Sequence, residues 1–113
     1  AVVQSAVNTS LSQTTLTVTL AAFGNANNAT FGTFMTDEVT DAAIAPGTGF
    51  TEIHDVGATE DPRLQTEWRN DNDTSVTATT GIIVDYAGIA VEIKQAVTAA
   101  VGTVKVPDLP FLW

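Results

Sequence analysis

The sequence predicts an all-β protein, and two patterns carry this prediction. Aliphatic and hydroxyl side chains alternate over short runs, which is typical of half-buried strands. Turn-forming residues separate these runs at the intervals expected between strands. The 113 residues fit one domain. We therefore predict a single antiparallel β-sandwich of about eight strands.

The clearest strand covers residues 15–20, where the two faces differ completely. One face is aliphatic and the other is made of threonine: Leu16, Val18 and Leu20 against Thr15, Thr17 and Thr19. Threonine is β-branched and suits the solvated face of a sheet. The aliphatic face is therefore expected in the core.

Six further runs are predicted to be strands, namely residues 2–7, 30–36, 50–56, 64–69, 75–79 and 86–94. In residues 30–36, the side chains of Phe31, Thr33 and Met35 share one face, opposite Gly32 and Phe34.

Two of these runs carry predictions about which face is buried. In residues 64–69, Trp68 shares a face with Leu64 and Thr66, against Gln65, Glu67 and Arg69, and this favours a core position for Trp68. In residues 86–94, the larger apolar side chains are expected to point inward: Ala87, Ile89, Val91 and Ile93, against Gly88, Ala90, Glu92 and Lys94.

Turn signals lie at residues 24–28, 45–49, 61–62 and 70–73. The polar run at 70–73 lies between two alternating segments and predicts a hairpin that joins them. Residues 38–44 fit either one helical turn or an edge strand.

The chain divides into a β-sandwich domain at residues 1–94 and a C-terminal arm at residues 95–113. Pro107 and Pro110 exclude a regular helix near the end, so the arm is predicted to be extended. Burying each large apolar side chain would contribute roughly 1.5–3 kcal/mol. Ordering the backbone costs on the order of 1–2 kcal/mol per residue, so the arm needs a receiving groove. The residues predicted to bind a partner are Leu109, Phe111, Leu112 and Trp113.

Charge and composition restrict the function. The formal net charge is −9, with only Arg63, Arg69, Lys94 and Lys105 basic, so nucleic acid and anionic lipid would repel the chain. Cysteine is absent, which excludes disulfides and thiolate metal sites. No apolar run approaches the roughly 20 residues of a membrane helix, and no signal peptide is recognised, so we expect a product made in the cytoplasm.

Several segments resemble a β-sandwich family that occurs in phage virion proteins and bacterial surface proteins. They are residues 3–6, 14–20, 46–53, 64–68, 74–78 and 86–94. The resemblance covers about residues 2–94 and implies a jelly-roll-like fold. It implies no active site, because its motifs are core and turn patterns.

Catalytic residues are not predicted. His54 is the only histidine, and Asp55 beside it would point to the opposite face of a strand, where it cannot orient the imidazole. Glu52, Glu67 and Glu92 could form a carboxylate pair of the glycosidase type. Glutamates on strands more often lie on a solvated face, and this is the expectation for all three.

No cofactor or metal site is predicted. The oxygen-rich run at 71–75 makes Asp71 and Asp73 the candidate ligands for a loosely bound cation. It lacks the glycine and the later glutamate of an EF-hand loop, and a turn rich in Asn and Asp accounts for it equally well.

The leading hypothesis is a structural virion protein, namely a capsid decoration (cement) protein of a tailed phage on the virion surface. Its predicted partners are other copies of itself, with a trimer favoured, or the lattice of a major capsid protein. Two alternatives stay open. One is an extracellular carbohydrate-binding or adhesin module, and the other is a filament subunit that exchanges a terminal strand.

Overall fold

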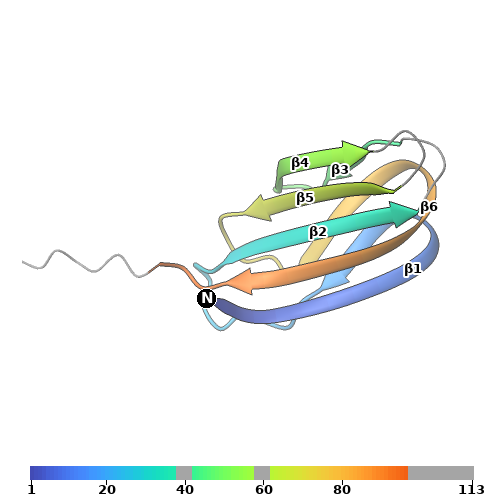
Figure 1. The fold of residues 1–113 in the computed structure, drawn as a ribbon. Coiled ribbons are helices and arrows are strands. Elements are labelled where there is room, and N and C mark those ends of the chain that lie inside the picture. Colours follow the sequence, from blue (N-terminus) through green and yellow to red (C-terminus); the bar gives the residue numbers. More distant parts are fainter. Residues whose placement is uncertain (38–41, 58–61, 97–113) are drawn as a thin grey trace, which may run out of the picture.

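The computed structural model describes residues 1–37, 42–57 and 62–96. This part of the chain is all-β, and its strands form one antiparallel sheet in the order β1-β6-β2-β5-β4, with β3 paired to β6 (Figure 1). The strands are β1 (Val2–Thr19), β2 (Ala29–Asp37), β3 (Ile44–Pro46), β4 (Thr51–Gly57), β5 (Arg63–Arg69) and β6 (Ser75–Ile93).

Two long strands, β1 and β6, fold this sheet over its own core. Residues 2–10 of β1 pair with residues 86–93 of β6, whereas residues 15–19 pair with residues 75–79. The register shifts between these two stretches, and Ser12 has a positive φ of 56° there. Both strands therefore bend, and the second half of β1 and the first half of β6 pass behind the front of the sheet (Figure 1).

The core lies between the front and back halves of the sheet. The back half contributes Leu16, Val18, Val76 and Ala78, and the front half contributes Phe34, Val84, Tyr86 and Ala90. The aliphatic face predicted for residues 15–20 is confirmed, because Leu16, Val18 and Leu20 are all buried.

Side chains of the front half hold the back of β1 in place. The Tyr86 hydroxyl donates to the Thr17 carbonyl oxygen (3.0 Å) and accepts from the Thr17 amide (3.0 Å). The Asn8 side-chain amide also donates to the Thr17 carbonyl oxygen (2.8 Å). Gln4 donates to the Ala21 carbonyl oxygen and accepts from the Ala21 amide, both at 3.0 Å. These bonds satisfy backbone groups that a further strand would otherwise pair.

The described residues form fewer strands than the sequence predicts. The runs 2–7 and 15–20 belong to the single strand β1, and 75–79 and 86–94 belong to β6. The predicted hairpin at 70–73 is wrong, because β5 pairs with β2 and β4 and not with β6. Residues 38–41 lie outside the described part, and β3 begins at Ile44. The jelly-roll-like sandwich and the separate arm at 95–113 stay predictions.

The predicted inward faces of β5 and of the second half of β6 are wrong. Trp68 and Ile89 are 41% and 47% exposed, whereas Gln65, Glu67 and Glu92 are fully buried. On β6 the reason is steric, because the back half of the sheet packs directly on this face. A Cβ at Gly88 would lie 2.8 Å from side-chain carbons of both Phe34 and Val18. A larger side chain does not fit at position 88, so Ile89 beside it points outward.

The close contact at Gly88 yields a prediction about stability. Gly88→Ala should lower the free energy of unfolding by about 1–3 kcal/mol, because the added methyl group overpacks the core against Phe34 and Val18. Chemical denaturation of both proteins measures this change. Gly81→Ala is the control on the same strand, since a Cβ at Gly81 meets no atom within 4 Å. Equal stabilities for the two variants would contradict the packing described above.

Candidate functional site

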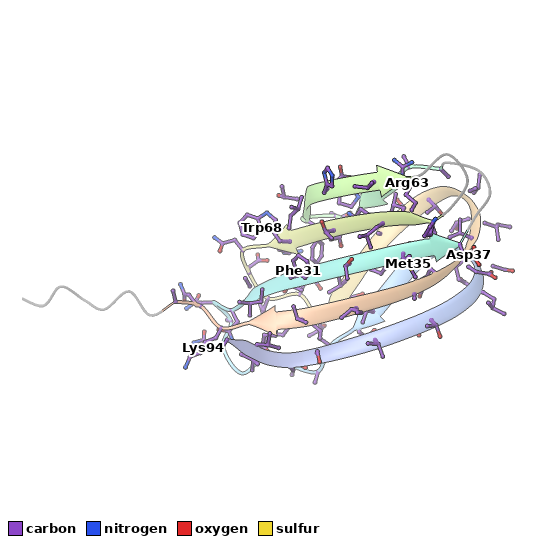
Figure 2. The ribbon with its side chains drawn as sticks, in the orientation of Figure 1. Phe31, Met35, Asp37, Arg63, Trp68 and Lys94 are labelled. Carbon is purple, nitrogen blue, oxygen red and sulfur yellow. The ribbon has the colours of Figure 1, made fainter. Side chains whose placement is uncertain are left out.

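The front of the sheet exposes a continuous apolar surface. The strand register aligns Val91, Phe31 and Trp68 across β6, β2 and β5, and two residues further along it aligns Ile89, Thr33 and Thr66. The next row contains Ala87, Met35 and Leu64. We call this surface the outer face; it comprises Ala87, Ile89, Val91, Ile93, Phe31, Thr33, Met35, Leu64, Thr66 and Trp68. Figure 2 shows Phe31, Met35 and Trp68 on the front of the sheet.

The outer face carries no charged side chain, although the whole chain has a net charge of −9. Met35 and Leu64 are 46% and 45% exposed, similar to Ile89 and Trp68. Monomeric proteins rarely expose large contiguous apolar surfaces unless these bind something. The outer face is therefore the candidate functional site.

A shallow hollow lies in the middle of the outer face. It has a volume of about 200 Å³ and is lined by Thr33, Met35, Leu64, Ala87 and Ile89. This hollow is apolar, and it spans the three central strands. An inserted side chain would contact residues from all three strands, so the hollow suits an aliphatic or aromatic group.

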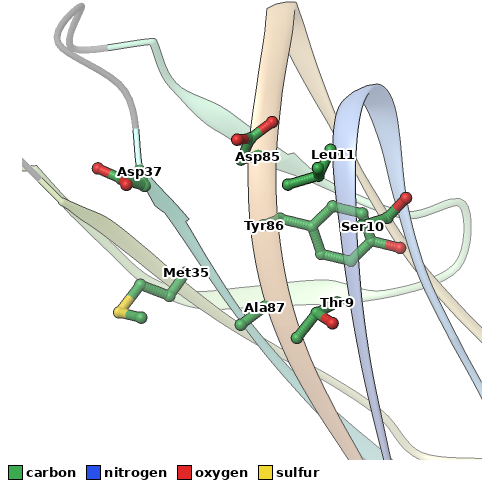
Figure 3. A pocket seen from close by; sticks show the side chains of 8 residues that line it. All are labelled: Thr9, Ser10, Leu11, Met35, Asp37, Asp85, Tyr86 and Ala87. Atoms are coloured by element: carbon green, nitrogen blue, oxygen red, sulfur yellow. The ribbon is translucent and has the colours of Figure 1, made fainter.

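A second hollow, of about 320 Å³, lies where the outer face ends at the bend of β1 (Figure 3). Leu11, Met35 and Ala87 give it an apolar wall, and Asp37 and Asp85 line its rim. These two aspartates are register partners on β2 and β6. Asp85 accepts a hydrogen bond from the Ser12 amide at 2.8 Å. The aspartates thus mark the boundary where the uncharged surface ends.

Glu67 is a buried carboxylate on the opposite, inner face. Its Oε2 accepts hydrogen bonds from the Gly47 amide (3.2 Å) and from the Gln65 side-chain amide (3.0 Å). Glu67 Oε1 and Gln65 Oε1 have no hydrogen-bond partner within the described residues. Burial raises the pKa of Glu67, because the charged form loses its hydration, and the nearby Glu52 carboxylate adds to this effect.

Glu92 is also fully buried, but both of its oxygens are bonded. Gln4 and Asn28 each donate a side-chain amide hydrogen to it at 2.6 Å. Asn28 in turn accepts from the Gln95 amide at 3.1 Å. Glu92 therefore ties the start of β1, the start of β2 and the end of β6 together.

The expected solvated face is wrong for Glu67 and Glu92, whereas Glu52 is exposed. The two buried carboxylates lie on β5 and β6, with β2 between them, opposite Gly32 and Thr30. Because neither has any solvent exposure, a sugar substrate cannot reach them. They act as structural groups within the core.

Asp71 and Asp73, the candidate cation ligands, both bind Arg69. The Arg69 guanidinium bonds Asp71 and lies 2.9 Å from Asp73 Oδ2. This arginine holds the pKa of Asp71 below its usual value. The guanidinium also stacks over the Phe50 ring, 5.9 Å from its centroid. Among the residues that the structure describes, no group of three or more acidic or histidine side chains could hold a metal ion.

His54 has no catalytic arrangement with its neighbour. Its side chain is exposed, whereas Asp55 forms a two-pronged ion pair with Arg63 at 2.6 and 2.7 Å. Asp55 also accepts from the Ile44 amide at 3.3 Å. The carboxylate thus joins β4 to β5 and β3 rather than orienting the imidazole.

The residues predicted to bind a partner, Leu109, Phe111, Leu112 and Trp113, lie outside the described part of the chain. Sequence reasoning missed the outer face, because it assigned the side chains from β5 and β6 to the core and left open which face of residues 30–36 is buried. The signal that identifies them is the row of small residues facing the opposite way, Gly88 and Ala90 on β6 and Gly32 on β2.

Comparison with protein-family models, curated proteins and solved structures finds no significant match to this chain. In residues 1–37, 42–57 and 62–96, no helix has the length and apolar character needed to cross a membrane.

Glu67 yields a prediction about pH. Its folded-state pKa is raised, so the folded protein holds this proton more tightly than the unfolded chain, whose glutamate titrates near about 4.3. The stabilisation is present at low pH and is lost as pH rises from the unfolded value through the raised one. Glu67→Gln removes this titration, so its stability relative to the original chain should increase with pH across that window.

Chemical denaturation at a series of pH values measures this difference. Asp37→Asn, on β2 and exposed, is the control and should change stability by no more than about 0.5 kcal/mol. A Glu67→Gln effect of the same size at every pH would contradict a raised pKa.

Proposed function

We propose that this protein is a structural component that works by binding another protein through the outer face. One observation carries the proposal: a charge-free apolar surface of three strands in a chain whose net charge is −9. Protein interfaces have cores depleted in charge and enriched in aromatic residues and methionine. Phe31, Trp68 and Met35 match that composition.

The acidic remainder of the molecule supports the same proposal. Like charges keep separate copies soluble and disfavour random contacts, while the uncharged face is left for a specific one. The tight hydrogen bonding of Glu92 and the ion pair of Asp55 hold this face on a rigid scaffold. A rigid sheet loses little conformational entropy when it docks.

More specifically, we propose a capsid decoration (cement) protein of a tailed phage, placed on the virion surface as a homo-oligomer, with a trimer favoured. Its support is the resemblance of residues 2–94 to jelly-roll-like virion domains, together with the acidic surface. Such a protein must stay soluble before docking and then contact a lattice over a broad surface.

One observation favours a second candidate, a carbohydrate-binding module. Trp68 is 41% exposed and lies directly opposite Phe31. A hollow of about 390 Å³ beside it is lined by Gly49, Thr51, Trp68, Arg69, Asn70 and Asp71. A sugar ring could stack on the indole while these polar groups bond its hydroxyls. This site covers only one end of the outer face and leaves the rest unexplained.

A matched pair of variants tests the proposed function. Ile89 and Ile83 are both exposed isoleucines on the same side of β6, but Ile83 lies beyond the boundary that Asp37 and Asp85 form. Ile89→Lys should weaken binding by about 10-fold or more, because a docked lysine is buried without a partner. Ile83→Lys should leave binding unchanged. Light scattering measures self-association, and cosedimentation with undecorated tailed-phage capsid shells measures docking.

Two outcomes would contradict the proposal. One is a chain that neither self-associates nor binds any shell. The other is equal binding by both lysine variants. Glycan binding that Trp68→Ala abolishes, in a chain that stays monomeric and binds no shell, would instead support the carbohydrate-binding candidate.

A further inference from the structure

Three strands lie at edges of the sheet. Within the described residues, β1, β3 and β4 each pair with a single neighbour, and no strand pairs with their other side (Figure 1). Such an edge presents backbone N–H and C=O groups that a further strand can bond. Proteins usually block it with charged side chains, proline, a bulge or a very short strand.

Two of these three edges are blocked. β4 carries Glu52, His54 and Asp55, and its register shifts between Glu52 and His54. β3 has only three residues and ends in Pro46. Neither strand is therefore suited to receive a further strand.

The first half of β1 has none of these protections. Residues 2–10 contain no charged side chain and no proline, and their pairing with β6 is unbroken over residues 4–10. The back of the same strand differs, because the Tyr86 hydroxyl bonds both backbone groups of Thr17. We call residues 4–10 the open edge.

We propose that the open edges of two copies of this chain pair antiparallel about a twofold axis at Val7, which joins their two sheets into one. Val7 is the middle residue of the open edge, so this register uses all seven of its residues. Residues that face each other across the axis have numbers that add up to 14. The facing pairs are Val7 with Val7, Ser5 with Thr9, Ala6 with Asn8, and Gln4 with Ser10.

The open edge is complementary to itself, which is why we infer a second copy rather than another protein. Val7 is 75% exposed in the single chain, and pairing places the same β-branched side chain opposite it. Ser5 and Thr9 bring two hydroxyl groups together. Cross-strand contacts of both kinds stabilise antiparallel pairs.

The charge of the chain lies away from the open edge. On β6, the residues opposite the open edge are 86–92, and the only charged one, Glu92, is fully buried. Asp85 and Lys94 are exposed but lie beyond the two ends of this stretch. At physiological ionic strength, charges further apart than about 8 Å are largely screened. Two copies can therefore approach along this edge in spite of their net charge of −9 each.

The pair would also enlarge the outer face. Val7 is the register partner of Ile89, and Ser5 is that of Val91, so these side chains of β1 lie on the same side of the sheet as the outer face. Facing residues of an antiparallel pair point to the same side. Both outer faces would therefore lie on one side of the joined sheet, as a single docking surface. This consequence rests on the proposed function, whereas the pairing itself does not.

The pairing also limits the stoichiometry. A contact that uses the same patch on both copies closes after two of them. A larger homo-oligomer, such as the trimer favoured above, would then need a second contact through another surface. A trimer without contacts at Val7 would contradict this inference and leave the proposed function intact.

Single-cysteine variants of the full-length chain test the pairing, because the sequence has no cysteine of its own and every disulfide must link two copies. In the proposed register, the two Val7 Cα atoms lie about 4.5–5.5 Å apart, within reach of a disulfide. Thr9→Cys is the matched control, since it is exposed on the same side of the same strand. Its two copies would lie about 13 Å apart along the strand, which is too far.

Oxidation followed by non-reducing electrophoresis should give linked dimers about 10-fold or more faster in Val7→Cys than in Thr9→Cys. A mixture of Ser5→Cys and Thr9→Cys chains should form mixed dimers faster than either variant links to itself. Equal rates in Val7→Cys and Thr9→Cys, or faster linking in Thr9→Cys, would overturn the inference.

Two lysine variants separate the open edge from the outer face. Ile89→Lys, added to Val7→Cys, should leave the linking rate unchanged, because the edge pairs through its backbone. Val7→Lys should weaken self-association in light scattering by about 10-fold or more, since it places like charges directly opposite each other. Ile53→Lys is the control on the blocked edge β4, where the side chain is 54% exposed, and should have no effect.

The outcomes distinguish this inference from the proposed function. Loss of linking in Ile89→Lys would mean that copies associate through their outer faces, and this would overturn the pairing. Docking to shells without linking at Val7 would also reject the pairing alone. Linking at Val7 without any docking would support the pairing and reject the proposed function.

Discussion

The contact of Gly88 with Phe34 and Val18 is the constraint on which the rest of the structure depends. At this point the back of the folded sheet touches the front so closely that a single methyl group has no room. Around this contact the inner side of β6 is therefore lined by small residues, Gly88 and Ala90. Larger apolar side chains of the same strand, such as Ile89, are left on the outside. The exposed outer face is thus a direct consequence of how the sheet closes.

Sequence patterns predicted strands well and predicted their orientation only where the two faces differ strongly. Residues 15–20 were assigned correctly because one face is entirely aliphatic and the other entirely threonine. In β5 one face carries Leu64 and Trp68, and the other carries Gln65 and Glu67. Hydrophobicity favoured burial of the first face, which is in fact exposed. A period of two fixes which residues share a face, but the buried side depends on contacts with distant strands.

The candidate site could likewise be predicted only in part. Phe31, Thr33 and Met35 were correctly predicted to share one face of a strand. Nothing in the local sequence indicates that this face is exposed to solvent. The bends of β1 and β6 were equally hidden, because the alternating pattern is interrupted at residues 8–14 and 80–85, and this is why two strands were counted as four. The burial of Glu67 and Glu92 could not be foreseen, because Gly47, Gln4 and Asn28, which donate to them, belong to other segments of the chain.

The pairing of β1 with β6 also determines when the protein can fold during its synthesis. Residues 2–19 find their backbone partners only in residues 75–93, so the first strand stays unpaired until nearly the whole described domain has been made. Contacts this distant in sequence slow folding, because a long loop must close before any of them forms. On the ribosome, β1 is a long uncharged segment waiting for its partner. It is therefore the part of the nascent chain most in need of protection from its neighbours.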